Sequence, residues 1–186
     1  MFQRWPRGNA LKKYLVMLTT LALVGCTSDT TIDSSGNFKT AKVDLDTALI
    51  ETYQQCVNAM TTGVYNAGDI ARTELKKTSK NRYFLEVPVD GSGSVSADYV
   101  KLNIHFLSVA RDKPVISCRV TAPKGIKYLN EFVDSFERFA KSNGYSLTRA
   151  GATYSFSTKG KEFAVYFEQS KSAMVKSLRV RFFSMN

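Results

Sequence analysis

Residue types on which many catalytic and metal sites depend are scarce in this sequence. Its 186 residues include one histidine, three cysteines and one tryptophan. Clusters of His and Cys are the usual zinc ligands, so we expect no metal site. A serine or cysteine nucleophile needs a basic partner; His105 is the only imidazole, and no Gly-x-Ser-x-Gly segment occurs. The sequence therefore predicts a protein that is not an enzyme, with no catalytic residue and no cofactor.

The sequence also lacks an apolar run long enough to span a membrane. Residues 14–24 form an apolar run about half as long as the roughly 20 residues that a spanning helix needs. The preceding residues 1–13 contain four basic residues and no acidic one. A basic segment, a short apolar segment and then small residues are typical of a secretory signal that is removed. Residues 1–25 are therefore predicted to be a signal peptide.

The end of this run, Leu23-Val24-Gly25-Cys26, resembles the lipobox of bacterial lipoproteins. The resemblance covers only the first 26 residues. It implies cleavage after Gly25 and a lipid, with palmitate among its acyl chains, on Cys26; several such chains hold a protein firmly to a membrane. Thr27 follows the cysteine, where inner-membrane lipoproteins of enterobacterial type commonly carry Asp, so the resemblance implies the outer membrane, facing the periplasm. The alternative is a chance cysteine at an ordinary cleavage site.

The remainder of the chain divides into a polar segment and a folded domain. Residues 26–43 contain the lipidated cysteine and a stretch rich in Ser, Thr, Gly and Asp, which predicts a flexible tether. Residues 44–186 are predicted to form a single α+β periplasmic domain, since the chain is 44% hydrophobic and 12% aromatic.

Without the four basic residues of the signal, 22 basic and 16 acidic residues remain, a net charge of +6. This charge suits an anionic membrane surface or an acidic partner. Nucleic acid, which exported proteins rarely meet, is not expected.

Hydrophobic periodicity predicts a helix, three strands, a second helix and three more strands. The first helix is expected to start near Asp44 or Asp46 and to stop near Gly68. Its apolar face contains Leu45, Leu49, Tyr53, Cys56, Met60 and Val64. The second helix covers residues 126–143, and the strands cover residues 82–89, 99–108, 115–122, 152–158, 161–168 and 175–184. The order α-βββ-α-βββ predicts an α+β fold with antiparallel sheets, helices packed on one face, and two similar halves.

Two cysteines, Cys56 and Cys118, remain once Cys26 is assigned to the lipid. In exported proteins such a pair usually forms a disulfide. Cys118 is predicted to point inward with Ile116 from strand 115–122, so it could meet Cys56. The two positions are 62 residues apart, for which loop-closure entropy gives roughly 4 kcal/mol of stabilisation. The alternative is two buried free thiols, because cysteine also packs well in a core.

Basic and aromatic side chains gather on the last three predicted strands. Lys161, Arg179, Arg181 and Tyr166 are the candidate partner-binding residues, because Arg and Tyr are frequent in recognition surfaces. The alternative is an ordinary solvated sheet face with alternating charge.

Together these observations favour a lipid-anchored cell-envelope protein whose α+β domain binds another envelope component, such as a protein partner in an assembly or secretion complex. Two alternatives remain open. One is a protective lipoprotein, either an immunity protein or an inhibitor of a toxin or lytic enzyme, which the basic charge and a disulfide fit equally well. The other is a carrier that encloses a small apolar ligand between sheet and helices.

Overall fold

A computed structural model describes residue 41 and residues 43–66, 69–70, 76–79, 81–91, 98–108, 115–171 and 176–185. The predicted signal peptide, Cys26 and the tether up to residue 40 lie outside the described residues, so they stay predictions. The elements in chain order are α1 (Leu45–Thr62), β1 (Lys76–Ser79), β2 (Arg82–Pro88), β3 (Tyr99–Ser108), β4 (Val115–Pro123), η2 (Gly125–Tyr128), α2 (Leu129–Ser142), β5 (Thr148–Ala150), β6 (Thr153–Thr158), β7 (Lys161–Lys171) and β8 (Lys176–Ser184). No helix in the described part of the chain is long and apolar enough to cross a membrane.

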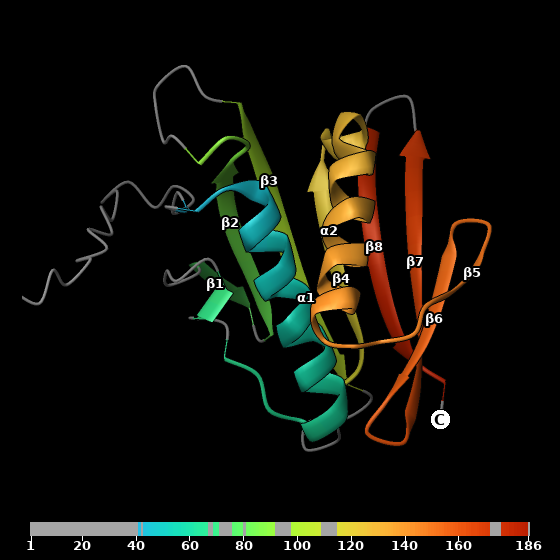
Figure 1. Cartoon of the computed structure of the whole chain (residues 1–186). Helices are drawn as coiled ribbons and strands as arrows, with labels where there is room; N and C mark the ends of the chain where they lie inside the picture. Colours follow the sequence, from blue (N-terminus) through green and yellow to red (C-terminus); the bar gives the residue numbers. More distant parts are fainter. Residues whose placement is uncertain are drawn as a thin grey trace, which may run out of the picture.

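The strands form one antiparallel sheet of eight strands in the order β1-β2-β3-β4-β8-β7-β6-β5. Both helices lie on the same face of this sheet and run side by side (Figure 1). The predicted α+β class and the order of the two helices and six longer strands are confirmed. The short strands β1 and β5 lengthen the two edges. Each half of the chain is thus a helix followed by four strands, and the halves join where β4 pairs with β8.

Helix α1 has a clear start and stop in the sequence. The Asp44 carboxylate accepts a hydrogen bond from the Thr47 backbone N–H at 2.8 Å, which caps the first turn. Gly63 ends the helix, because its φ of 75° lies in the left-handed region that favours glycine. The prediction that the helix stops near Gly68 is therefore wrong, and Val64 lies past the helix end with 70% of its surface exposed. The other predicted apolar-face residues of this helix are buried.

An aromatic cluster fills the space between the helices and the sheet. The Phe136 ring in α2 lies within 6.2 Å, centroid to centroid, of six other aromatic rings: Tyr53, Phe139, Tyr154, Phe156, Phe167 and Phe182. The Tyr53 hydroxyl donates to the Phe132 carbonyl at 3.1 Å, so the buried polar tip of this tyrosine has a partner and α1 is joined to α2. These rings pack both helices against one face of the sheet, and the polar side chains of the strands lie on the other face.

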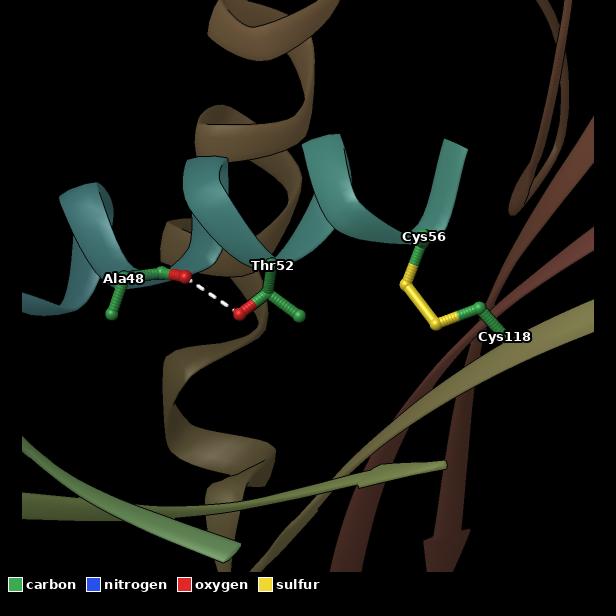
Figure 2. The surroundings of a disulfide bond; sticks show 4 residues. All are labelled: Ala48, Thr52, Cys56 and Cys118. Carbon is green, nitrogen blue, oxygen red and sulfur yellow. Dashed lines mark hydrogen bonds between the residues drawn. A yellow bond between two sulfur atoms is a disulfide. The ribbon is translucent and has the colours of Figure 1, made fainter. Parts of the chain in front are cut away.

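The predicted disulfide between Cys56 and Cys118 joins α1 to β4, with the two Cα atoms 5.4 Å apart. Figure 2 shows Cys56 pointing from the helix toward the strand that carries Cys118. One turn earlier, the buried Thr52 hydroxyl donates to the Ala48 carbonyl at 2.7 Å, so this polar group is satisfied within the helix. The disulfide thus connects the first helix to one of the two central strands.

A β-bulge near the start of β4 changes one predicted orientation. Leu107 faces Ser117 and Ser108 faces Val115, so Ile116 has no residue opposite it. Ile116 is 46% exposed, and its predicted inward orientation is wrong. The extra residue of a bulge shifts the alternation of side chains by one position, and here Val115 is buried instead.

Candidate functional site

The face of the sheet opposite the helices, called here the open face, has no described helix against it (Figure 1). Side chains alternate between the two faces of a strand, so each long strand contributes polar residues to the open face. Its central feature is a row of four basic residues at facing positions of neighbouring strands. Arg82 in β2 faces His105 in β3, His105 faces Arg119 in β4, and Arg119 faces Arg181 in β8. This basic row crosses the middle of the sheet.

The pairing of the strands, rather than local sequence, creates the basic row. Neighbouring strands are about 4.8 Å apart, so the row spans about 15 Å. Like charges directly opposite each other on adjacent strands are destabilising, and Arg119 directly faces Arg181. At this arginine pair, the row is therefore maintained against electrostatic repulsion.

A groove with a volume of 290 Å³ lies beside the row and is called here the open-face groove. It draws its lining from β2, β3, β4 and β8: Arg82, Tyr83, Phe84, Asn103, Ile104, His105, Arg119, Thr121 and Arg179. None of these lining residues is acidic. Three guanidinium groups from three different strands thus surround a small volume beside Phe84.

Few carboxylates offset these charges. Among the described residues, Glu168 pairs with Arg181, with 3.1 Å between the Arg181 Nη2 and a carboxylate oxygen, whereas no ion pair joins a described carboxylate to Arg82, Arg119 or Arg179. Burial lowers the pKa of Arg119, and the charges of the neighbouring arginines lower it further. In addition, the buried Nε of Arg181 has no hydrogen-bond partner. The groove is therefore a concentration of positive charge that an anion would relieve.

His105 holds one arginine of the groove in place. Its Nδ1 lies 3.2 Å from Nη2 of Arg119. A guanidinium only donates hydrogen bonds, so Nδ1 is the acceptor and the imidazole is neutral, with its proton on Nε2. Burial lowers the pKa of His105, and the charges of Arg82 and Arg119 lower it further, which favours this neutral form.

Three of the four candidate residues from the sequence lie together on the open face. Tyr166 in β7 faces Arg181 at the end of the basic row, and Tyr166 is 37% exposed. The Phe183 ring packs edge-on against the Tyr166 ring, with centroids 5.7 Å apart. Arg179 lines the groove. This part of the open face has the basic and aromatic composition expected from the sequence.

Lys161 lies away from this surface. Its Nζ donates to the carbonyl oxygens of Met60 at 2.8 Å and Thr61 at 3.3 Å, in the last turn of α1. The last carbonyls of a helix have no intrahelical donor, so a lysine there satisfies them and offsets the negative end of the helix dipole. Lys161 therefore stabilises the contact between α1 and the β6–β7 hairpin.

Sequence reasoning did not identify Arg82, His105 and Arg119 as part of the site. Alternation correctly placed His105 and Arg119 on the polar face. They lie beside Arg181 because β4 pairs with β8. That contact joins residues about 60 positions apart, and neither strand alone contains a pattern that predicts it.

In the described part of the chain, no group of three or more His, Cys, Asp or Glu side chains could hold a metal ion.

The fold and this surface together define a class: an α+β protein with one antiparallel sheet, two helices on one face and a cationic open face. No protein-family model, no curated protein and no solved structure matches the chain. Its function is therefore inferred from the open face and from the pattern of its first residues.

Proposed function

We propose that this chain is a lipid-anchored cell-envelope protein whose α+β domain binds another envelope component through the open face. The observation that carries the proposal is the basic row, in which Arg82, His105, Arg119 and Arg181 occupy facing positions on four adjacent strands. A face needed only for solubility gains nothing from like charges placed opposite each other, whereas an anionic partner converts that repulsion into attraction.

The proposed location has separate support. Disulfides persist in oxidising compartments such as the periplasm, and the Cys56–Cys118 bond suits a protein that folds there. The lipobox resemblance supplies the anchor at Cys26, with the outer membrane as the proposed site and the domain facing the periplasm. In this arrangement, the open face is presented to partners within the envelope.

The anchoring part of the proposal is tested by Cys26→Ser. Without an acylated cysteine, the chain should no longer be processed as a lipoprotein, so its signal segment should remain or be cut elsewhere. Cell fractionation and mass spectrometry of the N-terminus measure both consequences. An unchanged N-terminus and unchanged membrane fractionation would overturn the anchor.

The binding part is tested with a photo-crosslinking phenylalanine derivative at position 166, where it replaces one aromatic ring with another. Irradiation of intact cells should produce a specific adduct that mass spectrometry can identify. The double charge reversal Arg179→Glu with Arg181→Glu should reduce the adduct at least tenfold. The matched control, Lys141→Glu with Arg149→Glu, changes the net charge equally at exposed positions off the open face and should leave the adduct unchanged. An adduct that survives the open-face reversal would refute the proposal.

A further inference from the structure

We infer that the open-face groove binds the phosphomonoester group of a lipid headgroup, in the membrane to which the protein is anchored. This inference rests on the proposed function, because it names the chemistry of the envelope component that the open face meets. Three features of the groove and its position carry it: its charge density, its mixed lining and the place where the chain enters the domain.

The charge density of the groove fits a phosphate better than a carboxylate. Arg82, Arg119 and Arg179 surround 290 Å³ with no acidic residue in the lining. A phosphomonoester carries a charge of about −1.5 to −2 in a single compact group. An acidic polypeptide would need two or three carboxylates, with their side chains, in a volume at the lower limit of small-molecule sites, which are about 300–1,000 Å³. Arginine forks also match the oxygens of phosphate in bidentate geometry.

The apolar part of the lining favours a lipid over free phosphate. Phe84 lines the same groove as the three arginines, whereas the Ile104 side chain belongs to the buried core. Free phosphate is hydrated on all sides and gains nothing from apolar contact, whereas a headgroup phosphate is joined through glycerol to acyl chains. A second copy of the chain is a poor occupant of this face, because two basic rows would repel each other.

The chain enters the domain at β2, one of the strands that line the groove. The Ala41 backbone N–H donates to the Glu86 carbonyl at 2.8 Å, in the strand β2 that also carries Arg82 and Phe84. Cys26 lies 15 residues before Ala41. At about 3.5 Å per residue, the domain entry is held no more than about 50 Å from the lipid on Cys26. Such a short connection gives the groove a high effective concentration of headgroups, so a weak site would be occupied.

The test uses the full lipidated chain, purified in a neutral detergent and titrated calorimetrically. The probes are dihexanoyl phosphatidic acid, dihexanoyl phosphatidylcholine, inorganic phosphate and hexaglutamate. We expect saturable binding of phosphatidic acid, at least tenfold weaker binding of inorganic phosphate and hexaglutamate, and no binding of phosphatidylcholine. Equal affinity for inorganic phosphate would overturn the lipid source, and tighter binding of hexaglutamate would overturn the phosphate chemistry.

Two paired variants assign binding to the groove. Arg82→Gln with Arg119→Gln should lower the affinity for phosphatidic acid at least tenfold. Removing Arg119 relieves repulsion from Arg181, so the melting temperature of this variant should not fall, and weaker binding cannot be attributed to unfolding. The control Lys141→Gln with Arg149→Gln has the same change in net charge and should bind normally; an equal loss there would reduce the effect to nonspecific charge and overturn the inference.

The two proposals can fail separately. If phosphatidic acid does not bind while the adduct at position 166 still depends on Arg179 and Arg181, the phosphate inference is wrong and the proposed function stands. If phosphatidic acid binds through Arg82 and Arg119 but no adduct depends on the open face in cells, the groove is a phosphate site and the proposed function is wrong.

Discussion

Reduction of the Cys56–Cys118 disulfide tests how α1 and the sheet are held together in the first half of the chain. The bond joins α1 to the central strand β4, and both cysteines are fully buried. A reductant therefore cannot reach the bond in the native state. The protein is to be unfolded, reduced and refolded, which keeps both sulfur atoms in the core and removes only the cross-link.

The expected loss of stability follows from the length of the closed loop. The cysteines are separated by 62 positions, for which the chain-entropy model gives roughly 4 kcal/mol. Domains of this size are usually stable by about 5–15 kcal/mol, so the cross-link would account for a quarter or more of the total. With a urea m-value of about 2 kcal/mol per molar, the unfolding midpoint should fall by about 2 M.

Urea titration followed by far-ultraviolet circular dichroism measures this shift in the oxidised and reduced proteins. The double variant Cys56→Ala with Cys118→Ala is the control, because it has no bond to reduce and its midpoint should not respond to the reductant. A midpoint that falls by less than 0.5 M on reduction of the native chain would refute the loop-entropy reasoning. It would mean that contacts of the α1 segment persist in the unfolded chain and already restrict it, or that the bond strains the native fold.

Two further predictions concern Lys161 and His105. Lys161→Met keeps most of the side-chain length but removes the hydrogen-bond donors to the last turn of α1. It should therefore lower the free energy of unfolding by about 1 kcal/mol, measured by urea titration. The control Lys159→Met, at the exposed turn beside it, should leave that free energy unchanged. The pKa of His105 is lowered in the folded state by burial and by Arg82 and Arg119, so the unfolded chain binds a proton more readily. Stability should therefore fall as the pH drops below about 6.5, and His105→Asn, which keeps an acceptor for Arg119, should flatten the dependence of the unfolding midpoint between pH 7 and pH 5.

The long elements of the fold could be predicted from the sequence because each repeats its pattern several times. Six strands with sustained alternation and two amphipathic helices were found in the correct order. The short strands β1 and β5, with four and three residues, contain too few alternations to produce a pattern. The end of α1 was misplaced because two glycines, Gly63 and Gly68, were available as stops, and local sequence did not distinguish them.

The site was predictable only in part, because it depends on which strands pair. Alternation placed Arg179 and Arg181 on a polar face, and the structure has Tyr166 opposite Arg181 on that face. Lys161 belongs to the other face, where it satisfies helix carbonyls, and no local pattern marks such a contact between residues about 100 positions apart. The basic row draws on both halves of the chain, so it becomes visible only once β4 and β8 are adjacent.

Charged residues on the open face are paired in two different ways. Four positions along β2 from Arg82, Glu86 faces Lys101, with 3.9 Å between carboxylate and ammonium, as is usual for opposite charges on a solvated sheet. In the basic row, by contrast, Arg119 faces another arginine, Arg181. Replacing Arg181 with an acidic residue would remove the repulsion between the two guanidinium groups. Natural sequences depart from local consistency mainly where function requires it, so this arginine pair supports the proposal that this part of the sheet binds an anion.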